Sequence, residues 1–229
     1  MVGGIIDYLL SLPKSIYFCM KCLPVKQAVK IPVFVRYNTK LASCKGRLFL
    51  SDNIAWGGVK IGFGTVPVFD KKCQRTILHL DGKIIIKGKC LIGHGSRILV
   101  DRKGVLELGD KFHITANSTI MAFKKVRFGS DVLISWDVLL MDNDLHHIYS
   151  DLSMQSSETE QEICIGNHVW IGCRSTLLKG CVVNDNSVIA ANSVVTRKSC
   201  LIDTGNHNVS ILLAGNPAKI IKKGVNWEK

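Results

Sequence analysis

Two histidines, His146 and His147, stand side by side in the segment MDNDLHHIYSD, residues 141–151. A neutral imidazole, whose ordinary pKa is near ~6.5, can take a proton from a weak nucleophile such as a hydroxyl group. Asp142 and Asp144 lie just upstream, and a carboxylate can orient such a ring through its second nitrogen. An isolated pair of histidines would more often be two polar loop residues, so the interpretation depends on the surrounding elements.

The segment interrupts a repeat of six residues. A helix repeats every 3.6 residues and a strand every two, so a period of six predicts a short flat strand followed by a corner. Three such units make an 18-residue coil, and we expect the coils to stack as parallel strands in a solenoid. The phase slips near DRKG, where we expect a bulge or loop, and again across the histidine segment. The predicted inward positions are Ile86, Ile92, Ile98, Leu108, Ile114, Ile120, Val126, Val132, Val138, Ile165, Ile171, Leu177, Val183, Ile189 and Val195.

The residues between these positions suit tight corners. Glycine followed by asparagine or aspartate recurs in LGDK, FGSD and IGNH. These residue types tolerate the backbone angles of sharp turns. Ala190 and Ala191 are small enough to point inward in a narrow triangular coil. About five regular coils are expected.

The segments IGNHVWIGCRSTLLKGCVVNDNSVIAANSVVTRK and LAGNPAKIIKKG resemble the hexapeptide-repeat acyltransferases, and are most similar to acetyltransferases of bacterial surface-polysaccharide biosynthesis. The resemblance implies an all-β fold, a left-handed parallel β-helix over residues 81–222, with an inserted loop at 139–164. Residues 1–80 are then an N-terminal extension, with a short helix and irregular strands that cap the solenoid. A short C-terminal helix or tail is expected at 217–229.

The same resemblance assigns roles to particular residues. His146 is expected to act as the catalytic general base from the inserted loop, with Asp144 or Asp142 as its orienting carboxylate. Asn117 is expected to contact the acceptor. Trp170 matches a tryptophan that flanks the acyl-donor channel, and its indole is too large to point into a narrow coil.

The expected donor is acetyl-CoA, and no metal is expected. By resemblance, Gly172 and Ala190 lie at corners that accept the pantetheine arm, whereas Arg197, Lys198 and Lys219 lie near the nucleotide end. Direct transfer is expected, because no cysteine or serine stands in an evident nucleophile motif. The segment that follows VVTRK is longer than is usual in the family, which leaves the adenine contacts open.

The leading hypothesis is an O-acetyltransferase that acts on a sugar hydroxyl in capsule, lipopolysaccharide or exopolysaccharide synthesis. Two alternatives stay open: an N-acetyltransferase on an amino sugar, and a non-catalytic assembly module. A carbonic anhydrase on the same fold would need three histidines around zinc, and the seven histidines show no such spacing. The family's active sites lie between subunits, so a homotrimer is expected. His94, His113 and His168 fall on regular coils, where a solvated or stacked ring is expected.

Composition favours a reduced intracellular environment and an anionic partner. The nine cysteines are odd in number and scattered, as expected of thiols in a cytoplasmic protein. The net charge of +12 favours a phosphorylated partner, whereas the chain has no aromatic-rich basic module that would predict nucleic-acid binding. The apolar N-terminus is interrupted by Asp7, Pro13, Lys14 and Lys21. It predicts a short helix that packs on the domain, with at most peripheral association at an inner membrane.

Overall fold

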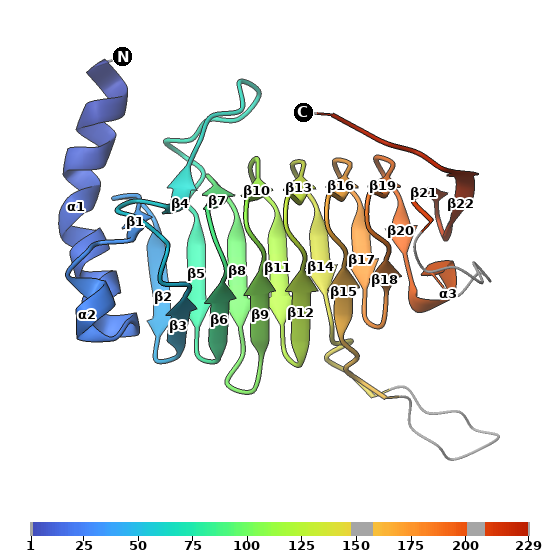
Figure 1. Cartoon of the computed structure of the whole chain (residues 1–229), viewed down its shortest axis with the longest axis horizontal. Helices are drawn as coiled ribbons and strands as arrows, with labels where there is room; N and C mark the ends of the chain where they lie inside the picture. Colours follow the sequence, from blue (N-terminus) through green and yellow to red (C-terminus); the bar gives the residue numbers. More distant parts are fainter. Residues whose placement is uncertain (1, 148–157, 201–208, 229) are drawn as a thin grey trace.

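A computed structural model of the chain describes residues 2–147, 158–200 and 209–228. The chain winds as a left-handed parallel β-helix with three sheets as its sides (Figure 1). Sheet A contains β1 (Val33–Val35), β4 (Val59–Phe63), β7 (Cys90–Gly93), β10 (Phe112–Ile114), β13 (Leu133–Ile134), β16 (Trp170–Ile171), β19 (Val188–Ile189), β21 (Ile211–Gly215) and β22 (Ala218–Lys223). Sheet B contains β2 (Lys40–Cys44), β5 (Ile77–Leu80), β8 (Arg97–Val100), β11 (Thr119–Ala122), β14 (Leu139–Met141), β17 (Thr176–Leu178) and β20 (Val194–Val195). Sheet C contains β3 (Arg47–Leu50), β6 (Lys83–Ile86), β9 (Val105–Leu108), β12 (Lys125–Phe128), β15 (Ile163–Ile165) and β18 (Val182–Val183).

Each strand pairs in parallel with the strand one coil away. Trp170 lies opposite Val188, for example, which is one coil of 18 residues further on. All fifteen predicted inward positions are buried, with at most 3% of each side chain exposed. The apolar core therefore runs along the axis of the solenoid, and the six-residue period predicted its positions correctly. The DRKG segment forms the expected turn, in which Gly104 N–H donates to the Asp101 carbonyl at 2.8 Å.

The small buried residues at the corners are mostly serines rather than the predicted alanines. Ala190 is only partly buried and Ala191 is exposed, so neither fills the core. Ser118 is fully buried, and its hydroxyl donates to the Ser135 carbonyl at 2.9 Å and accepts from Val138 N–H at 3.1 Å. A hydroxyl at this corner satisfies backbone groups of the next coil, which a methyl group could not do.

The first coil and two of the three strands of the second lie within residues 1–80, which were expected to form an extension. Strands β1 to β6 already occupy their places in the three sheets. The six-residue period is hidden here because a long segment, residues 64–76, separates β4 from β5.

Different elements close the two ends of the solenoid. Helix α1 (Val2–Cys22) lies across the first coil, as the predicted N-terminal helix, and α2 (Val25–Ala28) follows it (Figure 1). At the other end α3 (Arg197–Cys200) follows β20, and β21 pairs antiparallel with β22. The predicted C-terminal helix is wrong at 218–223, where the chain forms β22 along the edge of sheet A.

Candidate functional site

The interruption lies where the chain passes from sheet B to sheet C, a position named here the B–C corner. The chain leaves the coil after β14 and returns at β15. The two sides of the loop pair at its base through a bridge between Asn143 and Glu160, and Asp144 N–H donates to the Thr159 carbonyl at 2.9 Å. Residues 142–147 and 158–162 thus form a paired neck. Residues 148–157 lie outside the described residues.

Asp142 fixes the neck to the preceding coil. Its side chain is fully buried, and its two oxygens accept N–H groups from Phe123 at 2.8 Å, Lys124 at 2.9 Å and Lys125 at 2.8 Å. Burial raises the pKa of this carboxyl, and the three N–H donors act in the opposite direction. Both oxygens are used in closing the corner at residues 123–125, so the structure gives Asp142 an anchoring position.

Asp144 fixes the neck to the following coil. Its carboxylate pairs with Lys179 Nζ at 2.5 Å, and the same ammonium group donates to the Glu158 carbonyl. Lys179 stands at the B–C corner after β17. The role of Lys179 could not be predicted from sequence, because a lysine beside a corner glycine carries no local signal of a partner 35 residues away. The two predicted orienting aspartates therefore hold the loop from both sides.

Both histidines are exposed at the outer end of the described neck. Asn143 Oδ1 accepts Leu145 N–H at 2.6 Å, and Leu145 adopts a positive φ of 62°. This side-chain turn directs the chain away from the coil. Neither ring nitrogen of His146 has a hydrogen-bond partner among the residues that the structure describes. The imidazole is thus exposed and is not engaged by the described residues.

A second group of predicted residues lies at the A–B corner, where the chain passes from sheet A to sheet B. Asn117 has a φ of 51°, and its Nδ2 donates to Asp137. Gly172 and Ala190 follow β16 and β19 at the same corner of later coils. A Cβ on Gly172 would stand 2.6 Å from the Ala191 nitrogen, so only glycine fits this close approach between coils.

Trp170 faces outward from β16, as predicted, with 38% of its surface exposed. Its indole N–H donates to Ser135 Oγ at 3.1 Å, which ties the ring to the A–B corner of the preceding coil. The ring of Trp227 lies 6.2 Å from that of Trp170, measured between centroids. The Trp170 indole is therefore fixed in direction and remains partly exposed on the outer side of sheet A.

His168 joins the C-terminal segment to the coils. Its ring stacks on Trp227 at 4.5 Å, its Nδ1 lies 2.7 Å from Asp131 Oδ2, and its Nε2 lies 3.0 Å from the Trp227 carbonyl. The Asp131 carboxylate raises the pKa of His168 above its ordinary value, against a smaller desolvation effect. The stacked role agrees with the expectation for His168. His94 differs, because it is 99% buried, and burial lowers its pKa.

The cationic residues predicted for the nucleotide end occupy two elements. Arg197 and Lys198 are exposed on α3, at the B–C corner two coils beyond the histidine loop. The Arg197 side chain packs close to Gly180, the neighbour of Lys179: a Cβ added to Gly180 would lie 3.3 Å from Arg197 Cβ and Cδ. Lys219 is exposed on β22, where it lies opposite Ala214.

The predicted residues therefore form two rows along the solenoid. The A–B row contains Asn117, Gly172 and Ala190, with Trp170 beside it, whereas the B–C row contains Asp142, Asp144, His146, Arg197 and Lys198. Strands of sheet B, two to four residues long, separate the rows, a distance of roughly 7–13 Å along the strands. Among the residues that the structure describes, the two rows therefore lie on opposite edges of sheet B.

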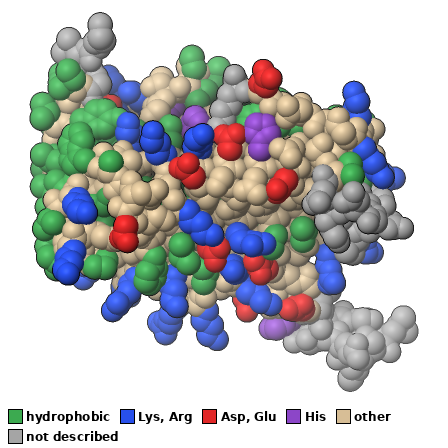
Figure 2. All heavy atoms as spheres, viewed as in Figure 1, with side chains coloured by type: hydrophobic (Ala, Val, Ile, Leu, Met, Phe, Trp, Pro, Cys, Tyr) green, Lys and Arg blue, Asp and Glu red, His purple; other side chains and the backbone are tan. Residues whose placement is uncertain are grey.

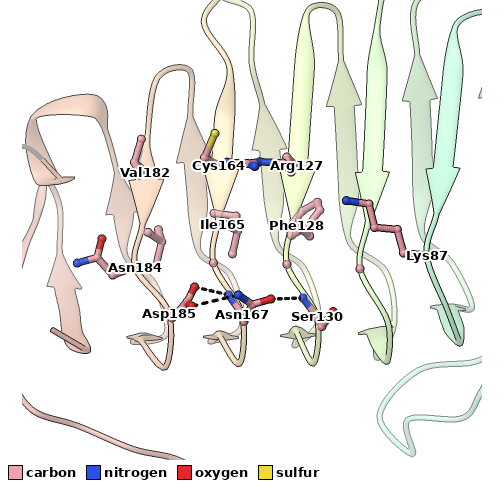
Figure 3. A pocket seen from close by; sticks show the side chains of 14 residues that line it. Lys87, Arg127, Phe128, Ser130, Cys164, Ile165, Asn167, Val182, Asn184 and Asp185 are labelled. Carbon is pink, nitrogen blue, oxygen red and sulfur yellow. Dashed lines mark hydrogen bonds between the residues drawn. The ribbon is translucent and has the colours of Figure 1, made fainter. Parts of the chain in front are cut away.

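Sheet C carries a separate hollow of about 520 Å³ (Figure 3). Arg127 and Lys87 lie on its wall, and Asn167 hydrogen-bonds to Asp185 at 2.7 and 3.0 Å and accepts Ser130 N–H at 2.8 Å. These polar corner residues form a ladder that ties successive coils together. None of the predicted site residues lines this hollow. Among the described residues, no group of three His, Cys, Asp or Glu side chains is arranged to hold a metal ion.

Comparisons with known proteins agree with this fold. The bacterial transferase hexapeptide (six repeats) family matches residues 165–197. The chain is 30% identical to the putative acetyltransferase YJL218W of Saccharomyces cerevisiae over 161 residues, which are 69% of this chain and 74% of the relative. It is 29% identical to the putative lipopolysaccharide biosynthesis O-acetyl transferase WbbJ of Escherichia coli K12, over 65% of this chain and 78% of the relative. A polysialic acid O-acetyltransferase of Escherichia coli O1:K1 is 30% identical over 66% of this chain, but the match spans only 44% of that longer protein.

The solved structures that are similar to this chain include the polysialic-acid-specific acetyltransferase NeuO. The TM-score is 0.48, with 24% identity over 85% of this chain and 74% of that chain. A galactoside acetyltransferase in complex with coenzyme A has a TM-score of 0.41 and 26% identity, over 52% of this chain and 56% of that chain. The repeat, the corners and the loop at the break define a hexapeptide-repeat protein. Together with its relatives, they show that the chain belongs to the hexapeptide-repeat acetyltransferase family.

Proposed function

We propose that this protein transfers an acetyl group from acetyl-CoA to a sugar hydroxyl in the synthesis of a surface polysaccharide, with His146 as general base. The O-acetyltransferase names of several relatives support the reaction class. Acetyl-CoA is a cytoplasmic metabolite, so the proposed reaction takes place on the cytoplasmic side. The single observation that carries the proposal is the position of His146, exposed beyond a neck that Asp142 and Asp144 anchor.

The proposed chemistry is direct transfer. A ring nitrogen of neutral His146 accepts the proton of the sugar hydroxyl while the hydroxyl oxygen attacks the thioester carbonyl. The carbon–sulfur bond of the tetrahedral intermediate then breaks, and the CoA sulfur leaves as a thiol by taking the proton from the His146 imidazolium, which returns the ring to its neutral form. Because Asp142 and Asp144 are engaged elsewhere, we propose that they position the histidine through the loop backbone.

We propose that the A–B row holds the donor. The close contact between coils at Gly172 leaves no room for a side chain, and a wall without side chains beside Trp170 suits the narrow pantetheine arm. The exposed cations Arg197, Lys198 and Lys219 are then available to the phosphates. The net charge of +12 favours such an anionic co-substrate.

We propose that the complete site forms between protomers of a homotrimer. The proposal rests on the position of the two rows, which lie on opposite edges of sheet B. A cleft that contains both Trp170 and His146 then forms where the A–B row of one protomer faces the B–C loop of a neighbour. Rotational symmetry would repeat that cleft at every interface.

The direct test measures release of CoA thiol with acetyl-CoA and a panel of nucleotide sugars, oligosaccharides and amino sugars. We expect turnover with a hydroxyl acceptor, and a fall of about 10²-fold or more in His146→Ala, as expected for a lost general base. His147→Ala is the matched control, because it removes the neighbouring ring from the same loop. Equal activity of His146→Ala and the unmodified protein would refute the assignment, and transfer only to amino groups would favour an N-acetyltransferase.

A further inference from the structure

Helix α1 is apolar on its outward face, whereas its inward face includes two buried serines. Ser11 and Ser15 point toward the solenoid and are fully buried. Ser15 Oγ accepts Val35 N–H at 2.9 Å, and Ser11 Oγ accepts Tyr37 N–H at 3.0 Å. The inward serines thus satisfy backbone groups at the open edge of β1, together with Phe18 and Cys19, which are buried beside them.

The outward face of α1 is apolar without interruption. At 100° per residue its exposed residues cover a face about 140° wide, with no charged residue within it. A terminal cap of a solenoid ordinarily has a polar outer face, which keeps the end of the stack in solution. Figure 2 shows hydrophobic side chains gathered at this end of the molecule. The exposed residues of this apolar face are Ile5, Ile6, Leu9, Leu10, Pro13, Ile16, Tyr17 and Met20.

Basic residues flank the apolar face. Lys21, Lys26 and Lys30 are exposed on α1 and around α2. The sequence of residues 1–30 contains one acidic residue, Asp7. Its Oδ2 lies 3.3 Å from Arg36 Nη2 and 3.4 Å from Lys71 Nζ, so its charge is already paired. Asp52 is exposed beside α2, where its Oδ1 accepts a hydrogen bond from Gln27 Nε2 at 3.2 Å. The end of the molecule therefore combines an apolar surface with an excess of positive charge, three exposed lysines against one exposed carboxylate.

A hollow of about 500 Å³ opens on the same end, between α1 and the first coils. Its wall is apolar and aromatic, and Trp56 beside it is 66% exposed. Lys60 lies at this hollow with its ammonium group 5.3 Å from the centre of the Tyr8 ring. The lining residues are Ile5, Tyr8, Leu9, Leu12, Phe34, Trp56, Gly57 and Lys60. Aromatic rings next to lysines are typical of surfaces that sit at the boundary of a lipid bilayer.

We propose that this end face binds the surface of an anionic lipid bilayer. Helix α1 lies in the plane of the membrane, with its apolar face among the acyl chains and Lys21, Lys26 and Lys30 at the phosphates. No helix in the described part of the chain is long and apolar enough to cross a membrane, which agrees with a helix that lies flat. A second copy of the chain fits less well, because two such faces would bring their lysines together. The sequence alone favoured simple packing of this helix on the domain. The helix does pack there, but its uninterrupted apolar outer face adds a second surface.

The test is flotation of the full chain with vesicles of phosphatidylcholine, with or without 30% phosphatidylglycerol (roughly the anionic content needed for attraction of surface lysines). We expect binding that requires the anionic lipid. The variant Leu9→Gln with Leu10→Gln should lower the vesicle partition coefficient at least tenfold, because two apolar side chains no longer enter the bilayer. Lys26→Gln with Lys30→Gln should lower it roughly thirtyfold, at about fivefold for each lysine near an anionic surface.

Ile221→Gln is the matched control, because Ile221 is 63% exposed at the opposite end of the solenoid. All changed residues are exposed, so circular dichroism should show unaltered folding, and acetyl transfer to a water-soluble acceptor should not change. Absence of vesicle binding by the unmodified chain would overturn the proposal. So would a loss of self-association in Leu9→Gln with Leu10→Gln without any vesicle binding, which would assign the face to a second copy.

Discussion

At the residue scale, some polar side chains of the candidate site hold the loop in place and others are exposed to solvent. Asp142 and Asp144 use their carboxylates to hold the loop, whereas His146 remains exposed beyond them. Arg197 and Lys198 are likewise exposed, on the same corner two coils further along. Residues that fix geometry and residues available to substrates are thus distinct.

Arg197→Ala should weaken donor binding without affecting the chemical step. We expect the KM for acetyl-CoA to rise roughly three- to tenfold, the scale of one exposed charged contact, with kcat nearly unchanged. Lys45→Ala, an exposed cation at a distant B–C corner, is the control. A loss confined to kcat would contradict the placement of Arg197 at the nucleotide end.

The His168–Asp131 pair should make stability depend on pH. The raised pKa of His168 means that the folded state holds the proton more tightly than the unfolded chain does. The pair therefore stabilises the fold fully below the ordinary histidine pKa, near ~6.5, and that contribution disappears as the pH rises through the raised value. Urea unfolding of the unmodified protein and Asp131→Asn should differ more at pH 6 than at pH 9; an equal difference at both would show that the pair contributes no proton linkage.

At the element scale, the contacts at the base of the loop let it leave the solenoid without disturbing the neighbouring strands. The strands β14 and β15 stay in register with their neighbours although the chain departs between them. The register survives because Asp142 replaces the backbone contacts that a regular corner would supply. An insertion of this kind leaves the coils above and below unchanged.

Asp142→Asn should destabilise the fold by about 1–3 kcal/mol, since an amide nitrogen would face N–H donors and leave them unpaired. Chemical denaturation gives the free energy of unfolding directly. Asp144→Asn is the comparison, with about 0–1 kcal/mol expected for a partly exposed ion pair. A larger loss in Asp144→Asn than in Asp142→Asn would reverse the assigned roles.

The coils from Ile86 onward could be predicted from sequence, because an inward residue at every sixth position is a local requirement of the fold. The loop could be placed for the same reason, by loss of that period between Val138 and Ile165. The roles of Asp142 and Lys179 could not, because their partners are 17 to 35 residues distant and are fixed only by coil register. The strand β22 could not be predicted, because its pairing partner β21 comes after the last regular coil, where the six-residue period no longer indicates strands.

At the scale of the whole molecule, the separation of the two rows leads to a test of the proposed trimer. His146→Ala and Trp170→Ala should each be nearly inactive as pure proteins. Unfolded together and refolded as a mixture, they should recover about a quarter of full activity, because random assembly pairs an intact A–B row with an intact loop at that frequency. No recovery in mixed oligomers would place both residues in a site within one protomer.

The antiparallel partner of β21 has a consequence for the behaviour of many molecules together. A stack of parallel strands ends in a row of unsatisfied amides and carbonyls, onto which another chain could add without limit. Strand β22 occupies that position, and its own outer edge carries Lys219, Lys222 and Lys223. These lysines would repel the same lysines of a second chain, so the edge of sheet A resists pairing with further chains into filaments.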